Sequence, residues 1–329
     1  MTPLLKVGIA GTGSYVPEKV MTNGDYAKFL DTSDEWIRER TGIRERRFAP
    51  DGMATSHMAE NAAKKAMEAA KVAPEDIDLV ICGTVTPDNM FPSTACHLQH
   101  RLGCVKAGAF DLSAACTGFI YSLSVGWNMV RTGSVRNVLV IGAEKLSTLL
   151  NMQDRTSCIL FGDGAGAAVV RPSENASEIL FSSLHSLGGT EDIMSLPAGG
   201  SAMPASHSSV DGKHHYLRIK GREVFKFAVT KMVEQVELCA EKCGVPVSKI
   251  ATIIPHQVNL RILEYASEKL NFPLDRMMIN IDRYGNTSAA SVPIALDEAV
   301  RSGRVKRGDL VVMVAFGAGL TWGSVAVRY

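Results

Sequence analysis

The sequence predicts an α/β protein made of two duplicated halves, and three observations support this fold class. Hydrophobic residues form 46% of the chain and aromatic residues only 6%, which favours tightly packed Ala/Val/Gly-rich layers over an aromatic-rich β-sandwich. The runs "NVLVIGA" and "DLVVMVAFG" are continuously apolar, as in central strands that helices cover on both faces. A pattern in the first half also recurs in the second, and 329 residues are enough for two such halves.

The repeated pattern consists of a helix end, a glycine turn and an apolar strand. It occurs in "MVRTGSVRNVLVIGAE" (residues 129–144) and again in "AVRSGRVKRGDLVVMVAFG" (residues 299–317). The matching positions are Arg131 and Arg301, Gly133 and Gly303, and Val135 and Val305. An apolar strand precedes each copy ("DIDLVICGTVT" and "KIATIIPHQ"), and a glycine-rich turn with a further strand follows it ("FGDGAGAAVVR" and "FGAGLTWGSVAVR"). We expect the halves to join near residue 178, which gives an N-terminal half of residues 1–178 and a C-terminal half of residues 179–329.

Cys116 lies in "DLSAACTGF", between an expected short strand and an expected amphipathic helix. A free cysteine is more often a small buried hydrophobe than a nucleophile. A thiol at a helix start, however, meets unpaired N–H groups and the positive end of the helix dipole, so we expect its pKa to be lowered. Small neighbouring residues leave room for an acyl group. Cys116 is therefore a candidate nucleophile, provided that the fold supplies polar partners.

Two further residues fall at similar junctions. His256 ends the apolar strand of "IIPHQVNLRI", at a strand end where α/β proteins collect ligands. Asn286 lies in "RYGNTSAAS", in a turn before the second-half helix that matches the one after Cys116. Each residue also has an ordinary structural interpretation, a satisfied core histidine and a helix-capping asparagine. Because both halves bring such a junction to one central region, we expect the three residues to meet there.

The net charge and the cysteine content limit which ligands and which cellular location the protein can have. The formal net charge of +1 opposes general affinity for nucleic acid or membrane, and no apolar run reaches the length of a membrane span. We expect a soluble, cytoplasmic protein that binds neither. The seven cysteines are an odd number, which indicates reduced thiols. Cys239 and Cys243 lie one helical turn apart, but no second Cys/His pair accompanies them, so we expect helix packing and no metal.

Taken together, "DLSAACTGF", "PHQVNLRI", "RYGNTSAAS" and "FGAGLTWGS" resemble the β-ketoacyl-[acyl-carrier-protein] synthase III family. The resemblance runs from "GIAGTGSYVPEKV" to the final "SVAVRY". It implies a thiolase-like fold, in which two duplicated βα halves stack as α-β-α-β-α layers around a Cys-His-Asn site. It also implies an acyltransferase that condenses an acyl-CoA primer, acetyl-CoA or similar, with malonyl-[acyl-carrier-protein] and releases CO2 and coenzyme A, the first step of fatty-acid synthesis.

Carried over residue by residue, the resemblance assigns Cys116 as the acylated nucleophile. His256 and Asn286 would bind the malonyl thioester carbonyl and stabilise the enolate, because two neutral donors in a dry pocket favour a newly formed oxyanion. The backbone N–H groups of Cys116 and Ala318 would hold the acyl oxyanion. Coenzyme A arrives as a thioester substrate, so no cofactor is implied.

The resemblance also assigns surfaces for coenzyme A and for the carrier protein. Trp36 of "DTSDEWIRERTGIRER" would stack on adenine opposite Arg155, since an indole and a guanidinium can sandwich a purine. The other assigned residues of this wall are Thr32, Arg40 and Asn259, the last on the pantetheine arm. Phe91 would close the acyl pocket across a homodimer interface. The acidic carrier protein would dock on basic residues at helical spacing, namely Arg222, Lys226, Arg261 and Lys269.

Other functions fit the sequence less well. "GIAGTGSYVP" lacks the third glycine of the dinucleotide fingerprint. The order Cys, His, Asn also suits a papain-like hydrolase, but the residues around the cysteine differ from that signature. A non-catalytic scaffold derived from a condensing enzyme would not need Cys116, His256 and Asn286 intact. The main alternative is a condensing enzyme of a polyketide or related pathway.

Overall fold

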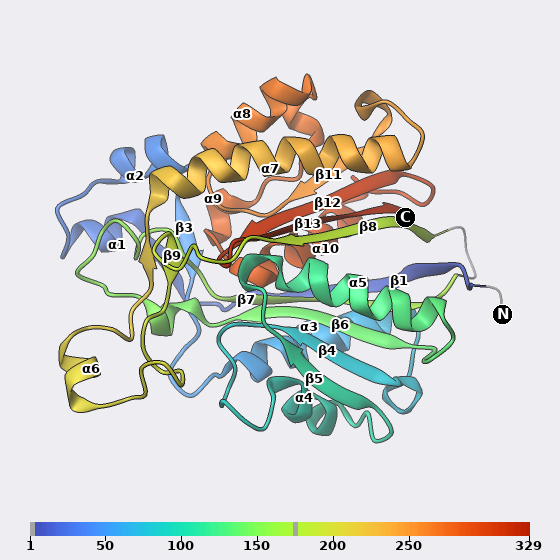
Figure 1. The fold of residues 1–329 in the computed structure, drawn as a ribbon, viewed down its shortest axis with the longest axis horizontal. Helices are drawn as coiled ribbons and strands as arrows, with labels where there is room; N and C mark the ends of the chain where they lie inside the picture. Colours follow the sequence, from blue (N-terminus) through green and yellow to red (C-terminus); the bar gives the residue numbers. More distant parts are fainter. Residues whose placement is uncertain (1–3, 174–176) are drawn as a thin grey trace.

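The computed structural model describes residues 4–173 and 177–329, and these form five alternating layers of helices and sheets. Two mixed sheets lie one above the other, two helices fill the space between them, and further helices cover the outer face of each sheet (Figure 1). The predicted α/β class and the five-layer stack are confirmed. None of the described helices combines the length and apolarity that crossing a bilayer requires.

The first sheet contains five strands from the first half of the chain. In spatial order they are β1 (Val7–Tyr15), β7 (Gly164–Pro172), β6 (Val138–Glu144), β4 (Leu79–Gly83) and β5 (Gly108–Leu112). β4 runs parallel to both β6 and β5, whereas β7 is antiparallel to β6 and β1. Every residue of β6 is buried, as the continuous apolar run predicts for a central strand.

The second sheet repeats this order with strands from the second half. Its strands are β11 (Thr252–Pro255), β12 (Leu310–Gly317), β13 (Thr321–Arg328) and β8 (Glu178–Ser186). β11 is parallel to β12, and β13 is antiparallel to β12 and β8, so the four strands correspond to β4, β6, β7 and β1. In the place of β5 there is a single parallel bridge between Ile253 and Met277. The predicted duplication is therefore present in strand direction as well as in sequence.

In the part of the chain that the structure describes, six long helices complete the layers. The central pair is α5 (Gly118–Arg131) and α10 (Ser291–Arg301); α3 (Thr55–Ala70) and α4 (Thr94–Leu102) cover the first sheet, and α7 (Gly221–Lys242) and α8 (Leu260–Leu270) cover the second. α5 contacts strands of both sheets, and its Ile120 and Leu123 are fully buried between them. Burying each such side chain contributes about 1.5–3 kcal/mol. Packing against both sheets therefore fixes the position of the central helices, and with it the position of their first turns.

The two central helices also end alike. Arg131 and Arg301 are their last residues, and Gly133 and Gly303 follow with φ of 75° and 72°. Only glycine adopts this left-handed conformation without strain, so the glycine of the repeated motif closes each helix and redirects the chain into the next strand.

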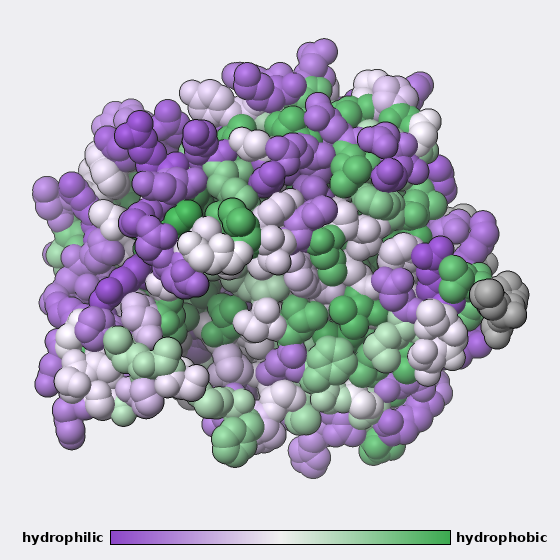
Figure 2. Space-filling model, viewed as in Figure 1, coloured by the Kyte–Doolittle hydropathy of each residue, from purple (hydrophilic) through white to green (hydrophobic). Residues whose placement is uncertain are grey.

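The short strands and short helices gather at the end of the layers where α5 begins (Figure 1). The short strands are β2 (Val20–Thr22), β3 (Glu45–Arg47), β9 (Met194–Ser195) and β10 (Arg218–Ile219), and the short helices are α1 (Asn23–Ala27), α2 (Asp34–Thr41), α6 (His207–Asp211) and α9 (Ile281–Tyr284). The 3-10 turns are Pro74–Asp76, Ala115–Thr117, Leu146–Leu149, Val247–Lys249, Leu274–Arg276 and Ser288–Ala290. Figure 2 shows mainly hydrophilic side chains over α2 and α8, and apolar side chains over α5 and β8.

Candidate active site

Cys116, His256 and Asn286 line one small pocket between the two halves of the molecule. Phe316 and Gly317, at the end of β12, also line it, and about 20 Å³ remains free inside, roughly the room for one water molecule. The remaining lining residues are apolar: Leu160, Met194, Ile219, Val224, Phe227, Val258 and Leu320. The three residues singled out in the sequence, separated by 170 positions along the chain, are therefore neighbours in space.

The cysteine occupies the turn that the sequence predicts. β5 ends at Leu112, the 3-10 turn Ala115–Thr117 follows, and α5 begins at Gly118. Ala115 has a φ of 47°, an unfavourable value for a residue with a side chain, and it sets the direction of Cys116. A Cβ atom on Gly317 would lie 2.7 Å from the Cys116 backbone nitrogen. The end of β12 can approach the nucleophile's backbone this closely only because residue 317 is glycine.

The expected lowering of the cysteine pKa is wrong for this structure. Cys116 is 5% exposed, and burial raises the pKa of its thiol to about 12. The buried carboxylate of Glu144 acts in the same direction, whereas the Ser288 hydroxyl and the cysteine's own N–H act against it. Desolvation of the thiolate outweighs the helix start, so the resting residue is a thiol.

His256 follows the last residue of β11, and its backbone N–H donates to the carbonyl of Val314 at 2.8 Å. Its Nδ1 lies 2.6 Å from the hydroxyl oxygen of Ser291, and its ring meets Phe316 edge to face at 5.4 Å. Burial lowers the pKa of His256 to about 3, because a charged imidazolium is unfavourable in this setting. The ring is therefore neutral, and Nε2 is the nitrogen left for the pocket.

Asn286 is held by both its backbone and its side chain. Its N–H donates to the carbonyl of Leu160 at 2.8 Å, and its own carbonyl accepts from Gly162 at 3.0 Å. The side-chain Oδ1 accepts the backbone N–H of Ser288 at 2.8 Å, which fixes the amide and leaves its N–H groups for the pocket. Asn286 thus caps the turn, as its structural interpretation required, and also lines the site.

The turns that precede the two central helices have the same shape. Ser288–Ala290 leads into α10 as Ala115–Thr117 leads into α5, and Ser288 has a φ of 50° where Ala115 has 47°. By this equivalence Cys116 corresponds to Ala289, so Asn286 stands just before its turn. A Cβ on Gly142 would lie 2.2 Å from the Ala289 carbonyl oxygen, which shows how closely β6 and the second turn are packed.

This arrangement suits acyl transfer to sulfur. A thiol faces two uncharged hydrogen-bonding side chains in a nearly dry pocket, and neutral donors stabilise an oxyanion that forms there more strongly than they would in water. Apolar walls exclude water from the acyl group. The geometry does not provide the charged histidine that a cysteine hydrolase uses for activation.

The wall assigned to coenzyme A is partly assembled. α2 carries Trp36 and Arg40, and the Arg40 guanidinium carbon lies 4.7 Å from the centre of the indole. Arg155 lies 5.0 Å from the same centre and hydrogen-bonds the Asp31 carbonyl. This separation does not admit a purine between Trp36 and Arg155, so Arg155 has to move before a sandwich can form. The side-chain oxygen of Thr32 is buried without a hydrogen-bond partner among the described residues.

Two other predicted binding residues lie in different settings. Asn259 is the N-cap of α8: its Oδ1 accepts the Arg261 N–H at 3.0 Å, while its Nδ2 donates to the Arg40 carbonyl at 3.0 Å. Its amide therefore links α8 to α2, with one N–H left. Phe91 is 83% exposed and does not line the pocket of its own chain.

The predicted basic residues lie on two adjacent helices. Arg222 and Lys226 are near the start of α7, Arg261 and Lys269 are on α8, and all four are exposed. None of them forms an ion pair with another residue in the described ranges. α8 also carries Glu264 and Glu268, so this surface is mixed in charge rather than uniformly basic.

Sequence reasoning missed three polar residues around the pocket. Ser291 contacts His256, Ser288 contacts both Cys116 and Asn286, and Glu144 contacts Ser288. The two serines lie within "GNTSAAS", but the positive φ of Ser288 leaves no sign in the sequence. Glu144 ends "NVLVIGAE", where a carboxylate after a buried strand was the available signal.

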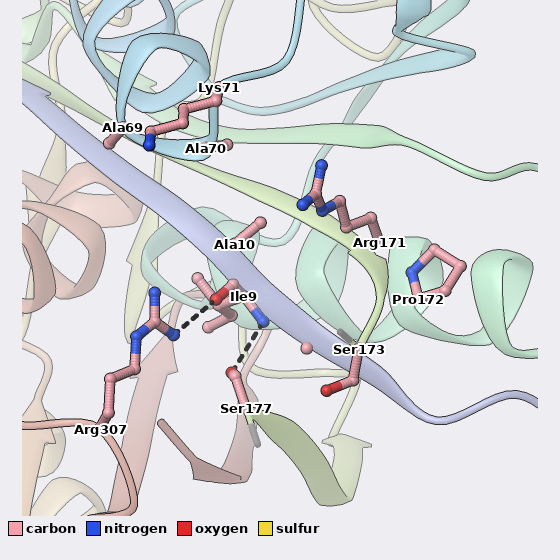
Figure 3. A pocket seen from close by; sticks show the side chains of 11 residues that line it. Ile9, Ala10, Ala69, Ala70, Lys71, Arg171, Pro172, Ser173, Ser177 and Arg307 are labelled. Atoms are coloured by element: carbon pink, nitrogen blue, oxygen red, sulfur yellow. Dashed lines mark hydrogen bonds between the residues drawn. The ribbon is translucent and has the colours of Figure 1, made fainter. Parts of the chain in front are cut away.

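A second cavity, of about 220 Å³, lies elsewhere, between the N-terminal part of β1 and the end of α3 (Figure 3). Lys71, Arg171 and Arg307 approach it, and the Arg307 guanidinium donates to the Ile9 carbonyl. The described residues that line it include no thiol, imidazole or carboxylate. It is larger than the pocket at Cys116 but lacks the groups for acyl transfer.

Known proteins resemble this chain along its whole length. Family models described as 3-oxoacyl-[acyl-carrier-protein] synthase III and its C-terminal part match residues 110–188 and 240–329. A β-ketoacyl-[acyl-carrier-protein] synthase III of Caldanaerobacter subterraneus is 53% identical over 329 residues, covering 100% of this chain and 99% of that protein. The crystal structure of 3-oxoacyl-[acyl-carrier-protein] synthase III from Aquifex aeolicus superposes with a TM-score of 0.91 at 48% identity, over 98% of this chain and 100% of that one. The priming β-ketosynthase of the R1128 polyketide pathway gives 0.91 at 35% identity, over 99% and 97%.

Proposed function

The chain belongs to the β-ketoacyl-[acyl-carrier-protein] synthase III family, and from that membership we propose how its own residues carry out the reaction. It is an acyltransferase that initiates fatty-acid synthesis by condensing an acyl primer with malonyl-[acyl-carrier-protein]. The observation that carries the assignment of residues is the meeting of Cys116, His256 and Asn286 in one nearly dry pocket.

In the first half-reaction the Cys116 sulfur attacks the thioester carbonyl of an acyl-CoA, acetyl-CoA or similar. The sulfur–acyl bond forms, the bond to coenzyme A breaks, and coenzyme A leaves with the thiol proton. The backbone N–H groups of Cys116 and Ala318 hold the oxyanion, an assignment supported by the close contact of the adjoining Gly317 with the Cys116 nitrogen. Two preorganised donors of this kind stabilise a tetrahedral intermediate without needing a metal or a cofactor.

In the second half-reaction malonyl-[acyl-carrier-protein] enters and loses CO2. The Nε2 of His256 and the amide of Asn286 donate to the malonyl thioester oxygen, which becomes an enolate oxygen as the carbon–carbon bond breaks. A Ser291 hydroxyl that donates to Nδ1 leaves the imidazole proton on Nε2, where the enolate needs it. The enolate carbon then attacks the acyl carbonyl carbon on Cys116 and forms the new carbon–carbon bond. The carbon–sulfur bond breaks, the β-ketoacyl product leaves on the carrier protein, and the released cysteine sulfur takes up a proton to restore the thiol.

The proposal also assigns the surfaces that bind coenzyme A and the carrier protein. Trp36, with Thr32, Arg40 and Arg155 around it, receives the adenine end of coenzyme A; the unpartnered Thr32 hydroxyl and the two guanidinium groups on the indole support this. Asn259 offers its remaining N–H to the pantetheine arm. The carrier protein docks on Arg222, Lys226, Arg261 and Lys269.

Assembly and location complete the proposal. Phe91, exposed on its own chain, closes the acyl pocket of a second copy in a homodimer, and the enzyme works in the cytoplasm without a cofactor. The halves meet near residue 178, as residues 1–178 and 179–329; the first sheet ends with β7 at Pro172, and the second begins with β8 at Glu178.

Mass spectrometry of the acyl-enzyme tests the central assignment. After the protein is mixed with acetyl-CoA, we expect an acetyl adduct on the peptide that contains Cys116, and we expect none in Cys116→Ser. A panel with isobutyryl-CoA and octanoyl-CoA then ranks the primers. Because only about 20 Å³ is free around the sulfur, acetyl transfer should be fastest. An adduct on another cysteine, or an acylated Cys116→Ser variant, would refute the role of Cys116.

A further inference from the structure

Glu144 is a buried carboxylate beside the active site that the mechanism above does not use. It is the last residue of β6 and is 0% exposed. Its oxygens accept hydrogen bonds from neutral groups: the hydroxyls of Thr84 (3.2 Å), Thr86 (2.6 Å) and Ser288 (3.1 Å), and the backbone N–H groups of Val85 and Thr86. No lysine, arginine or histidine in the described ranges forms an ion pair with it. An ionised carboxylate is costly to bury in this way without a counter-ion.

Near neutral pH the carboxyl group of Glu144 is present in both its protonated and its ionised form. Burial raises the pKa of its carboxyl group to about 7, although the hydroxyl and N–H donors oppose the shift. The neighbouring Lys145 does not neutralise it, because its ammonium group donates to the carbonyls of Pro50 and Met53. The group can therefore take up or release a proton under the conditions in which the enzyme works.

Ser288 connects this carboxylate to the nucleophile. Its hydroxyl donates to Glu144 Oε1 at 3.1 Å and lies close enough to the Cys116 sulfur to act on the pKa of the thiol, while its backbone N–H holds the side chain of Asn286. Ser288 has a φ of 50°, an unusual value for a residue with a side chain. One hydroxyl is thus hydrogen-bonded to the carboxylate and also lies beside the sulfur.

Charge balance makes Glu144 a better proton acceptor than His256. A carboxylate that accepts a proton becomes neutral, which burial favours, whereas an imidazole that accepts one becomes a cation, which burial opposes. Moving the thiol proton to Glu144 also keeps a single negative charge in the site, shifted from carboxylate to sulfur. Forming a thiolate beside an ionised Glu144 would instead bury two negative charges.

We propose that Glu144 accepts the proton of the Cys116 thiol through the Ser288 hydroxyl, and so is a positioning residue for nucleophile activation. The S–H bond breaks as its proton passes to Ser288 Oγ, and the Ser288 proton passes to Glu144 Oε1. The sulfur electron pair then attacks the thioester carbonyl carbon. When the bond to coenzyme A breaks, the proton returns through Ser288 to the departing sulfur. This inference rests on the proposed role of Cys116.

The charged and titratable groups around this chain come from several elements. His256 faces Cys116 from the end of β11, and Cys82 of β4 lies near Glu144 together with Asp88 and Asp111. Asp88 is hydrogen-bonded to Ser56, and Asp111 to the backbone N–H groups of Thr94 and Ala95. The hydrogen bond from the Ser288 hydroxyl distinguishes Glu144 from these acids, because that hydroxyl also lies beside the sulfur.

The rate at which iodoacetamide alkylates Cys116 between pH 5 and 10 tests the proposal in the full-length protein. We expect Glu144→Gln and Ser288→Ala to slow alkylation at pH 7 by about a hundredfold and to move the profile to higher pH, since general-base assistance contributes about that much. Asp163→Asn is the matched control: Asp163 is also fully buried, and among the described residues it accepts hydrogen bonds from Ala49 and Ser147 and not from Ser288. It should alkylate at the wild-type rate.

A purely electrostatic or structural role for Glu144 gives the opposite result. Removing its negative charge would then lower the thiol pKa and speed alkylation in Glu144→Gln, and that outcome would overturn the proposal. Ser288→Ala keeps the carboxylate in place, so it still tests the proposal if Glu144→Gln does not fold. Unchanged alkylation in a folded Ser288→Ala protein would also overturn the proposal. Wild-type acetylation at Cys116 is measured in parallel, so that failure of the proposed function is recognised separately.

Discussion

Gly317→Ala tests whether the contact between β12 and the nucleophile controls acyl transfer. The added Cβ would lie 2.7 Å from the Cys116 backbone nitrogen and 3.2 Å from its Cβ. Ordinary van der Waals contact begins near 3.4 Å, so the two backbones must separate by about 0.7 Å. Both are backbone segments, held by β12 on one side and by α5 on the other, and neither can yield by rotating a side chain.

The displacement falls between the two N–H groups assigned to the oxyanion. A misplacement of about 1 Å can cost a factor of about a hundred in rate, so we expect Gly317→Ala to slow acetylation of Cys116 by roughly that factor. Quenched-flow mass spectrometry with acetyl-CoA measures the rate, and thermal unfolding checks the fold. Gly188→Ala is the control, since no described residue other than its two chain neighbours has an atom within 4 Å of the Cβ it would gain. A correctly folded Gly317→Ala enzyme that acetylates at the wild-type rate would refute the assignment of this oxyanion site.

Three further predictions follow from the site and the surface. Asn286→Ala should raise the activation free energy for decarboxylation of malonyl-[acyl-carrier-protein] by about 3 kcal/mol and should affect acetylation of Cys116 less. Release of CO2 measures the first step and the mass of the acetyl adduct measures the second. Equal loss of both steps would contradict the role of Asn286. His256 has a lowered pKa, so its contribution to stability is present above pH 6.5 and lost as the pH falls toward 3. Urea unfolding should therefore show that the stability difference between wild type and His256→Gln shrinks by about 3 kcal/mol from pH 7.5 to pH 4.5, and a constant difference would contradict this. Arg261→Glu should weaken use of the carrier protein, with a smaller loss at high salt, while acetylation by acetyl-CoA is preserved; equal loss with both substrates would count against docking there.

The repeat in the sequence predicts much of the fold. The apolar runs before and within each copy become β4, β6, β11 and β12, and the glycines at 133 and 303 close α5 and α10 with nearly the same φ. These features depend on local residue pattern, which the sequence displays directly. The bridge at Met277, in place of a fifth strand, depends on packing between segments and has no such pattern.

In the active site, too, some features can be predicted from local sequence pattern and others depend on the whole fold. Cys116, His256 and Asn286 stand at strand ends and helix starts, positions that can be located from local pattern, and the structure brings them together. The direction of the cysteine pKa could not be obtained from that reasoning, because the helix start is a local feature whereas burial depends on the whole fold. The same limit applies to Glu144, whose partners Thr84 and Ser288 are far away in sequence.

The duplication explains how a single polar path arises at the junction of two similar turns. Because Ala115 and Ser288 are equivalent, as are Cys116 and Ala289, the contact between Cys116 and Ser288 has an all-alanine counterpart in Ala289 and Ala115. One turn therefore supplies the sulfur and the other supplies the hydroxyl that leads to Glu144. Two copies that both carried cysteine would bury two thiols with one acceptor, and two copies that both carried alanine would leave Glu144 without its link to the pocket. The chemistry therefore depends on the different side chains of the two turns, and the shared backbone shape places those side chains next to each other.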